Sequence, residues 1–151
     1  MTEKAQKVEN EIKIDKEGNW FYNDAQIINR HILLLFCNSL ENDNNGGYLL
    51  RVDKETSPVI VENTPFVVVD AVKNEDVLKI QLNDETVETL DMGSFFIDRN
   101  NVPFCRVKDG QFHARFLRKA YYRIAECFGQ DEDERFFVRM VGEKIYVKQE
   151  K

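Results

Sequence analysis

The sequence has 151 residues, of which 42% are hydrophobic and 32% are charged. This balance is typical of one globular domain or of two small subdomains packed together, and it excludes a disordered chain. The formal net charge of −6 argues against binding to nucleic-acid polymers or to anionic membranes, because both depend on cationic side chains. The longest apolar run, residues 32–37, is too short to cross a bilayer. The N-terminal segment has no apolar core of signal-peptide type, so we expect a cytoplasmic protein without membrane insertion.

The first third of the sequence predicts a hairpin followed by a helix. Residues 12–22 alternate in the manner of two short strands around a turn. Asp24 is the predicted N-cap of a helix over residues 27–40, a segment that is apolar on nearly every side. We therefore expect protein to cover most of the surface of this helix, which ends at the polar, glycine-containing residues 41–47.

The remainder of the sequence predicts mostly strands. Short β-branched runs from residue 47 to residue 90 predict an antiparallel meander, and residues 95–108 predict a further strand, turn and strand. Apolar residues that recur every four positions predict a helix over residues 111–128. Residues 135–149 close the chain as a hairpin.

The order hairpin, helix, hairpin occurs twice, over residues 12–62 and over residues 95–149. One constant offset of 83 aligns four residues of the two opening hairpins: Ile14, Asp15, Lys16 and Phe21 with Ile97, Asp98, Arg99 and Phe104. Beyond the helices, Arg51 falls over Arg139. Shared element order at similar spacing favours an internal duplication.

Three adjacent aromatic residues follow the first predicted turn. Because side chains alternate along a strand, Phe21 points to one face while Trp20 and Tyr22 point to the other. The alignment matches Phe21 with Phe104, so we expect Phe21 to occupy the core position that both halves require. Trp20 and Tyr22 then lie on a divergent face, which covers the other half, a partner or a ligand.

Five stretches of the sequence form an ordered set: IKIDKEGNWFY, GYLLRV, VIVENTPFVVVDA, PFCRVKDG and RKAYYRIAE. This set resembles the signature stretches of the bacterial domain-of-unknown-function family 1285, and the resemblance covers residues 12–126. It implies two related α+β halves, the second similar to pleckstrin-homology-like folds. The family has no established activity. The resemblance implies binding of a nucleotide-like ligand at the interface between the halves and a role in signal transduction.

The predicted fold class is α+β, with duplicated hairpin-helix-hairpin units joined by an antiparallel β meander. The expected parts, packed as one unit, are an N-terminal tail (residues 1–11), a first α+β subdomain (12–72), a connecting β segment (73–94) and a second α+β subdomain (95–151).

Charged residues are divided between two adjoining segments. Residues 74–98 hold seven acidic residues and one basic residue, whereas residues 99–123 hold seven basic residues and one acidic residue. On the predicted second helix, Arg115, Lys119 and Arg123 follow at four-residue spacing. This basic face either binds a phosphate-like anion or is a solvated face that pairs with the acidic segment, and the sequence leaves both interpretations open.

We predict a non-enzymatic module that binds a small anionic or nucleotide-like ligand near the junction of the halves. Arginine offers paired donors to phosphate, and an aromatic ring can stack on a nucleobase. The predicted contacts are Trp20, Tyr22 and Arg51 from the first half and Arg106, Arg118, Tyr122 and Arg123 from the second. The alternative is a protein-interaction module or a structural homodimer without a small-molecule ligand, which uses exposed strand edges and aromatic side chains.

Patterns of catalytic and metal-binding residues are weak in the sequence. His31 and His113 are not spaced to a nucleophile or a metal partner, and the three cysteines contain no CxxC pair. Cys37 lies in the most apolar segment, where a thiol is poorly reactive. The aligned residues Asp15 and Asp98 are better placed to accept backbone hydrogen bonds than to catalyse. We therefore predict no catalytic residue, no cofactor and no metal.

Overall fold

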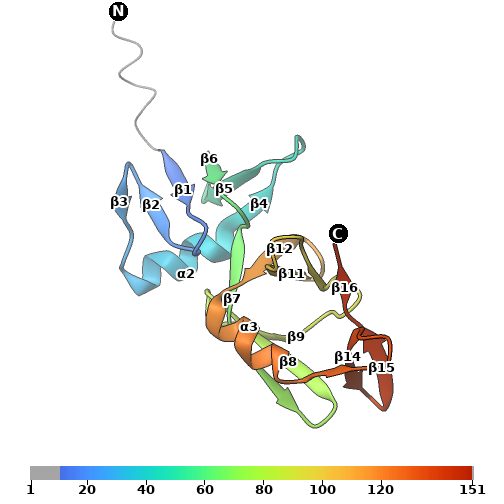
Figure 1. The fold of residues 1–151 in the computed structure, drawn as a ribbon. Helices are drawn as coiled ribbons and strands as arrows, with labels where there is room; N and C mark the ends of the chain where they lie inside the picture. Colours follow the sequence, from blue (N-terminus) through green and yellow to red (C-terminus); the bar gives the residue numbers. More distant parts are fainter. Residues whose placement is uncertain (1–10, 151) are drawn as a thin grey trace, which may run out of the picture. The chain divides into compact units, whose positions relative to one another are not determined.

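Strands make up most of the regular secondary structure in the computed structural model, which describes residues 11–150 (Figure 1). The described residues form an α+β fold with two helices, as the sequence predicted. Their contacts divide the chain into Met1–Pro65, which we call unit 1, and Phe66–Lys151, which we call unit 2. Neither of the two helices is long and apolar enough to span a membrane. The predicted tail, residues 1–11, lies outside the described residues except for Glu11.

In unit 1, six strands form one sheet in the order β3-β2-β1-β6-β5-β4, and the helix α2 lies between β3 and β4 in the chain. The elements are β1 (Ile12–Ile14), β2 (Trp20–Tyr22), β3 (Ala25–Gln26), α2 (Arg30–Ser39), β4 (Leu40–Asn42), β5 (Tyr48–Val52) and β6 (Glu55–Val61). Neighbouring strands are antiparallel except β1 and β6, which run parallel. The β1–β6 pair therefore joins the opening strands and the closing strands into one sheet.

One carboxylate fixes the turn between β1 and β2. Asp15 accepts hydrogen bonds from the N–H of Glu17 at 2.9 Å and from the N–H of Asn19 at 2.8 Å. Gly18 supplies the left-handed conformation of this turn, with φ at 85°. The prediction that Asp15 accepts backbone hydrogen bonds is confirmed.

The core of unit 1 lies between the sheet and α2. Ile14 and Trp20 face each other across β1 and β2, and they are 0% and 1% exposed. The Trp20 ring packs on Phe36 of α2 with the ring centroids 5.7 Å apart. Phe21, which the sequence placed in the core, is half-buried on the opposite face of the strand. The pairing of Trp20 with the buried Ile14 explains why Trp20 rather than Phe21 is in the core, because residues directly opposite each other lie on the same face of the sheet.

Helix α2 is shorter and less covered than the sequence predicted. Asn29 rather than Asp24 is the N-cap, and its side chain accepts a hydrogen bond from the N–H of Ile32 at 3.1 Å. Cys37 is buried, whereas Ile32 and Leu35 are 42% and 48% exposed. The apolar run predicted the helix, but it did not show how much of the helix surface is covered by the rest of the protein.

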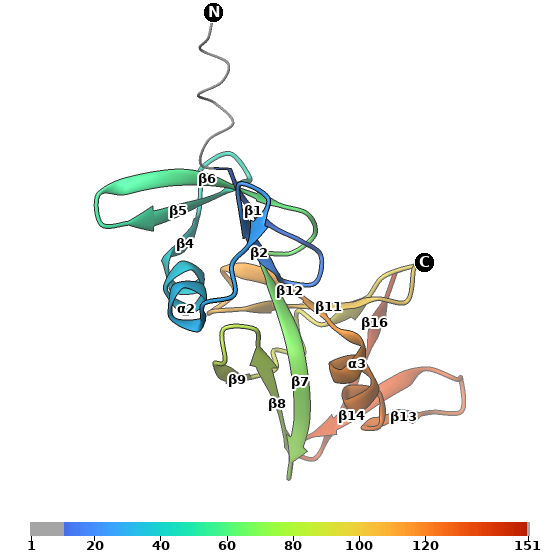
Figure 2. The same ribbon diagram turned by 90° about the vertical axis from the view of Figure 1, so that its left-hand side faces the viewer.

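Unit 2 contains two sheets and the helix α3 (Arg118–Ala125). The seven-stranded sheet has the order β16-β10-β11-β12-β7-β8-β9, and the three-stranded sheet has the order β13-β14-β15. The strands are β7 (Phe66–Asn74), β8 (Val77–Leu82), β9 (Val87–Thr89), β10 (Phe96–Ile97), β11 (Pro103–Val107), β12 (Phe112–Phe116), β13 (Phe128–Gln130), β14 (Phe136–Met140), β15 (Glu143–Tyr146) and β16 (Lys148–Gln149). β7 runs parallel to β12, and β10 runs parallel to β16. Figure 2 shows α3 beside the long strand β7.

The predicted helix over residues 111–128 begins only at Arg118. Residues 112–116 form β12, which pairs with β11 on one side and with β7 on the other. Phe112, Ala114 and Phe116 are buried, as expected for every second residue of a strand. A spacing of four residues fits both the helical period and the strand period, so Phe112 and Phe116 alone did not distinguish them.

The predicted meander is divided between the two units. β5 and β6 belong to unit 1, whereas β7, β8 and β9 belong to unit 2. β7 pairs with β12, a strand that follows it by about forty residues of chain. Residue 72, where the sequence ended the first subdomain, lies within β7.

Aromatic pairs fill the core of unit 2. The Phe66 ring lies 5.3 Å from Phe112, and the Phe95 ring lies 5.4 Å from Phe116 between centroids. Phe95 also contacts Phe128, whose centroid is 6.3 Å away. The helix α3 packs against β7, and its buried residues are Ala120 and Ile124.

Candidate functional site

Helix α3 carries three of the predicted ligand contacts. It begins with Arg118 and Lys119 and has no acidic residue in its first turn, and the side chain of its N-cap residue Leu117 accepts no hydrogen bond from the helix N–H groups. Tyr122 lies one turn further and is 62% exposed. The Arg118 side chain makes no hydrogen bond or ion pair within residues 11–150. The first turn of α3 therefore presents backbone N–H groups next to an uncompensated guanidinium.

Asp70 of β7 compensates the other two cations of α3. Its carboxylate oxygens lie 3.3 Å from Lys119 Nζ and 3.4 Å from Arg123 Nε. Arg123 Nε also donates to the carbonyl oxygen of Ala71 at 3.0 Å. Desolvation raises the pKa of Asp70, but the N–H of Ala71 and the two cations outweigh it, so this pKa lies below its ordinary value. Much of the basic face is thus paired, though with Asp70 rather than with the acidic segment.

Arg106 and Arg115 do not join this group. Arg106 lies on β11 opposite His113, and its side chain donates from Nη1 to the carbonyl oxygen of Gly110 at 2.8 Å. The four steps along the extended chain from His113 to Leu117 span about 13 Å, and this distance separates Arg106 from the start of α3. Arg115 belongs to β12, so the predicted basic stripe from Arg115 along a helix does not exist.

The predicted contacts of the first half lie on two faces of one sheet. Trp20 and Tyr22 are on the face toward α2, where Trp20 is buried and Tyr22 is 42% exposed. Arg51 alternates with the buried Leu50 on β5 and therefore points to the other face. There its Nε lies 3.0 Å from a carboxylate oxygen of Glu41 on β4. The structure thus brings Trp20 and Tyr22 together and separates both from Arg51.

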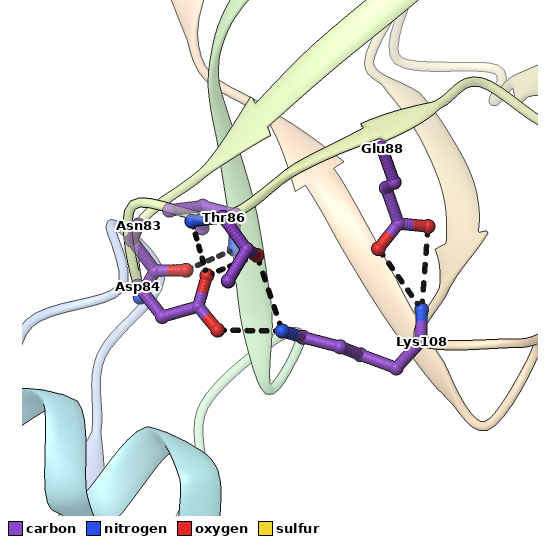
Figure 3. A network of polar contacts seen from close by, with 6 residues as sticks. Asn83, Asp84, Thr86, Glu88 and Lys108 are labelled. Atoms are coloured by element: carbon purple, nitrogen blue, oxygen red, sulfur yellow. Dashed lines mark hydrogen bonds and ion pairs between the residues drawn. The ribbon is translucent and has the colours of Figure 1, made fainter.

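A buried ion pair in unit 2 was not predicted from the sequence (Figure 3). Lys108 Nζ lies 2.6 Å from Asp84 Oδ2, and the Asp84 side chain is 1% exposed. Both the N–H and the hydroxyl of Thr86 donate to Asp84 Oδ1, at 3.1 Å and 2.6 Å. The N–H of Lys108 points to both carboxylate oxygens of Glu88, at 3.2 Å and 3.4 Å. These contacts tie the β8–β9 turn to the β11–β12 turn.

The charge division of the sequence was the signal for this pair. Asp84 and Glu88 belong to the acidic segment, and Lys108 belongs to the basic segment that follows it. The sequence did not reveal which residues pair, because this depends on the order of β8, β9, β11 and β12 in the sheet. The Asp84–Lys108 ion pair thus connects the acidic segment to the basic segment within unit 2.

The Asp84 cluster is poorly suited to catalysis. Desolvation raises the pKa of Asp84, but hydrogen bonds from Lys108 and Thr86 outweigh it, and the pKa lies below its ordinary value. A carboxylate with a lowered pKa is a weak base toward the Thr86 hydroxyl. Lys108 Nζ is engaged as a donor to Asp84 and to the Thr86 hydroxyl. We therefore assign this cluster a structural role.

The surroundings of Cys105, Cys127 and His113 do not activate these side chains as nucleophiles or bases. Burial raises the pKa of the Cys105 thiol to about 12, and burial also raises the pKa of Cys127. Burial, followed by the charge of Arg106, lowers the pKa of His113, which has no nucleophile beside it in the β12 register. Within residues 11–150, no group of three or more His, Cys, Asp and Glu side chains is arranged to hold a metal ion.

Comparisons with known proteins identify solved structures with a similar fold. No protein-family model matches the sequence, and no curated protein matches it. A DUF1285 family protein from Silicibacter pomeroyi DSS-3 is similar with a TM-score of 0.73 and 22% identity, over 93% of this chain and 80% of that chain. A DUF1285 family protein from Shewanella baltica OS155 is similar with a TM-score of 0.63 and 19% identity, over 76% of this chain and 90% of that chain.

These similarities agree with the resemblance found in the sequence. The chain has the fold of domain-of-unknown-function family 1285 proteins, and the resemblance is confirmed at that level. At these identities the likeness concerns the fold alone, and a fold does not by itself assign a function. The function must therefore be argued from the side chains of this chain.

Proposed function

We propose that the chain is a non-enzymatic ligand-binding protein that holds an anionic group at the first turn of α3. The observation that carries the proposal is the absence of a side-chain cap or an acidic residue at a helix start that carries Arg118 and Lys119. Backbone N–H groups at a helix start attract anions. A phosphate there would accept hydrogen bonds from these groups and from Arg118, which has no partner among the described residues.

The charges of α3 support this location. Cations in the first turn of a helix oppose its dipole and cost roughly 0.3–1 kcal/mol each. At the start of α2, Asn29 accepts the hydrogen bond of an N–H group, whereas Leu117 at the start of α3 does not. A bound anion would offset the repulsion that Arg118 and Lys119 experience. Arg123 lies in the last turn of α3, where it contacts Asp70, and it adds to the positive charge of the helix.

A nucleotide-like ligand is the specific form of this proposal. Tyr122 is exposed on α3, one turn from Arg118, and its ring can stack on a base. Arg106, Arg51, Trp20 and Tyr22 are not needed at this site. A role in signal transduction and a pleckstrin-homology-like second half, both implied by the resemblance, remain predictions.

Thermal unfolding tests the proposal. We expect nucleotides or phosphorylated metabolites at millimolar concentration to raise the melting temperature, because a ligand that prefers the native state stabilises it. Arg118→Ala combined with Arg123→Ala should abolish this shift. Arg99→Ala, which removes an exposed cation from the β10–β11 turn, is the matched control and should retain it. A panel without any response, or an unchanged response in the double variant, would refute an anion site on α3.

A protein-interaction module is the second candidate, favoured by exposed apolar side chains in unit 1. Ile28 precedes α2 and is 82% exposed, and Ile32 and Leu35 follow at helical spacing with 42% and 48% exposure. Such a cluster is unusual on a surface that contacts only water. Light scattering across protein concentrations should show self-association that Ile32→Lys abolishes. A monomer at all concentrations would argue against the homodimer.

We further infer that the two units arose by internal duplication. Their strand ladders share registers at a constant offset of 83 in the opening hairpins. The β1–β2 pairs Lys13–Phe21 and Ile14–Trp20 correspond to the β10–β11 pairs Phe96–Phe104 and Ile97–Pro103. β1 pairs in parallel with β6, as β10 does with β16. Such agreement of register is more specific than the order of elements.

The strands after the helices correspond at an offset of 88. The β4–β5 pair Leu40–Leu50 corresponds to Phe128–Val138, and the β5–β6 pair Arg51–Thr56 corresponds to Arg139–Lys144. The order β3-β2-β1-β6-β5-β4 is thus matched by β12, β11, β10, β16 with β15, β14 and β13. The unit 2 sheet extends beyond this set by β7, β8 and β9.

The carboxylate turns correspond as well. Asp98 accepts backbone hydrogen bonds two and four residues ahead, at 2.9 Å each, as Asp15 does. Asp43 and Asp131 repeat this pattern in the second hairpin of each unit. The expected role of Asp98 as a backbone acceptor is confirmed. Four turns with one pattern support descent from one unit.

A further inference from the structure

Unit 1 contains a cavity of about 270 Å³ that takes no part in the proposed anion site. Its apolar wall consists of Ile12, Leu50, Val52 and Phe36. Ile12 and Leu50 are each 4% exposed, and Phe36 belongs to α2. The cavity therefore lies between the helix and the sheet face that α2 covers.

Three polar side chains complete the lining. They are Tyr22, Ser57 and Glu55. The ladders explain why they share this face, because each is directly opposite a residue of the apolar wall: Ile12 opposite Tyr22, Leu50 opposite Ser57 and Val52 opposite Glu55. Glu55 is the charged residue of the lining, and it has no ion pair or hydrogen bond within residues 11–150.

The cavity has an approach from the surface. A shallower depression of about 700 Å³ is lined by Val52, Asp53, Lys54 and Glu55, which form the turn between β5 and β6. Val52 and Glu55 line both spaces. A ligand entering along this turn would pass the Glu55 carboxylate before its apolar part reached Phe36 and Leu50.

The corresponding positions of unit 2 carry partly different side chains. At the offsets of the two ladders, Phe95 stands for Ile12, Met140 for Val52, Cys105 for Tyr22 and Ile145 for Ser57. Phe95 and Cys105 are 0% exposed, and Met140 is 9% exposed. Glu55 corresponds to Glu143, so both units have a carboxylate at this position. The hydroxyl groups of Tyr22 and Ser57 are therefore the polar groups of the lining that belong to unit 1 alone.

Trp20 lies beside the cavity and carries a buried donor without a partner. Its ring contacts Phe36 of the wall, with centroids 5.7 Å apart. Its Nε1 is the buried side-chain polar atom without a hydrogen bond within residues 11–150. Buried donors are normally satisfied by protein, water or ligand. Trp20 does not itself line the cavity, and an ammonium has no lone pair to accept from this donor, so the residue serves as a reporter of binding and not as a contact.

We propose that unit 1 binds a small organic amine in this cavity. A pocket that is mostly apolar with a few polar groups is typical of small-molecule sites. The Glu55 carboxylate complements an ammonium group and repels anions, and the rings of Tyr22 and Phe36 attract cations through their faces. The apolar body of the ligand lies against Leu50 and Ile12. This chemistry is opposite in charge to that of the anion site on α3.

Trp20 makes binding measurable, because it is the one tryptophan of the sequence and contacts the cavity wall. Fluorescence titration with 2-phenylethylamine should give a saturable change in Trp20 emission, with a matching rise in melting temperature. Phenylacetate has the same ring and a carboxylate in place of the ammonium, and it should give neither. Failure of 2-phenylethylamine in both measurements, or equal binding of phenylacetate, would overturn the proposal.

Three variants assign the binding to this cavity. Glu55→Gln keeps the size of the side chain and should raise the Kd for 2-phenylethylamine about tenfold through loss of the charge-assisted contact. Ser57→Ile introduces the unit 2 residue and should abolish binding by filling the space. Glu62→Gln removes an exposed carboxylate that does not line the cavity, and its Kd should be unchanged. An unchanged Kd in Glu55→Gln would contradict the site even if Ser57→Ile failed to fold.

Discussion

Asp84 is the buried charged residue within residues 11–150, and its surroundings explain how unit 2 accommodates it. Lys108, Thr86 and the Thr86 N–H direct three donors to its two carboxylate oxygens. The Lys108 side chain is 25% exposed and its Nζ lies 5.3 Å from the centroid of the Phe66 ring. The ion pair is thus held between a core ring and the surface.

Removal of the Lys108 charge should leave Asp84 buried without its counter-ion. We expect Lys108→Met to lower the free energy of unfolding by about 3 kcal/mol, because an unpaired buried charge is strongly destabilising. Urea unfolding measures this change. Lys119→Met breaks an ion pair whose lysine side chain is 65% exposed, and should cost less than about 1 kcal/mol. Similar losses in the two variants would show that Asp84 does not depend on Lys108.

The double variant Asp84→Leu with Lys108→Met separates pairing from burial. Replacement of both partners by apolar side chains removes the unpaired charge, so part of the stability lost in Lys108→Met should return. The free energy of unfolding of the double variant should therefore exceed that of Lys108→Met. A further loss would indicate that the Thr86 contacts, not the Lys108 charge, dominate at this position.

Asp84 should also contribute to stability in a pH-dependent manner. Its pKa in the folded state lies below the ordinary value of 3.8, so the folded state binds this proton more weakly than the unfolded state. The stabilisation is then present above the unfolded pKa and is lost as pH falls through the folded pKa. We expect the stability difference between wild type and Asp84→Asn to be constant down to about pH 5 and to shrink below about pH 4.

Urea unfolding of the two proteins at a series of pH values measures this difference. The comparison with Asp84→Asn is needed because Asp70 and Asp131 also have lowered pKa values. Their contributions are present in both proteins and cancel. A difference that grows as pH falls would have the wrong sign for a lowered pKa.

Alternation along β2 was predictable from the sequence, but the choice of the core face was not. The sequence separated Phe21 from Trp20 and Tyr22 correctly, since only one of these sets can face α2. The pairing of Ile14 with Trp20, together with Phe36 of α2, decides the face. Identity with Phe104 was a poor guide, because Phe104 is itself half-buried and stacks on Phe96 across β10 and β11.

At the scale of elements, the pairing of β13 with β14 includes a close contact between a glycine and an aromatic ring. Gly129 of β13 lies directly opposite Phe137 of β14. A Cβ atom at Gly129 would lie 2.5 Å from Cζ of Phe137. The Phe137 ring is also fixed on its other sides by Tyr146, 6.0 Å away between centroids, and by Lys144 Nζ at 4.7 Å.

Gly129→Ala should force the Phe137 ring out of this position. We expect a loss of about 1–3 kcal/mol, as for other cases of overpacking. Phe137→Leu shortens the opposing side chain, so Gly129→Ala should cost much less in that background. A double-mutant cycle by urea unfolding measures the coupling. Equal costs in both backgrounds would mean that the ring moves freely and that the glycine is not needed for it.

Helix α3 shows why the sequence predicted the element but not its start. Phe112 and Phe116 are four residues apart, and this spacing places two side chains on the same face of either a helix or a strand. Arg115 and Lys119 have the same spacing, so they resemble the basic face of a helix although Arg115 belongs to a strand. Partners distant in the sequence decide the conformation, because β12 is hydrogen-bonded on both sides to β7 and β11. The α3 part of the candidate site, Arg118, Tyr122 and Arg123, was predictable. The separation of Arg106 from α3 was not predictable, because it follows from the position at which β12 ends and α3 begins.

At the scale of the whole molecule, the corresponding ladders of the two units contain different interiors. Unit 1 keeps a cavity with Tyr22, Ser57 and Glu55 in its lining. Unit 2 has Phe95, Cys105 and Ile145 in place of Ile12, Tyr22 and Ser57, and its seven-stranded sheet extends by β7, β8 and β9. The repetition stays a prediction from the sequence, which could not assign β7 to unit 2 because the β7–β12 pairing is non-local.

The division of contacts into two units predicts that they unfold in separate steps. Each unit has its own sheet and buried apolar core, which is the usual condition for a cooperative unit. Trp20 fluorescence reports on unit 1, whereas far-ultraviolet circular dichroism reports on the strands of both units. We expect the two signals to give urea transitions that do not coincide.

Lys108→Met decides whether the steps are independent. The substitution lies in unit 2 and should shift the part of the circular dichroism transition that the Trp20 signal does not follow, while the Trp20 midpoint stays unchanged. Glu62→Gln, at an exposed position of unit 1, is the control for an unspecific effect of losing a charge. If Lys108→Met moves the Trp20 midpoint as far as it moves the circular dichroism midpoint, the two units unfold as one. The amine cavity of unit 1 would then depend on the stability of unit 2, and ligand binding in either unit would stabilise both.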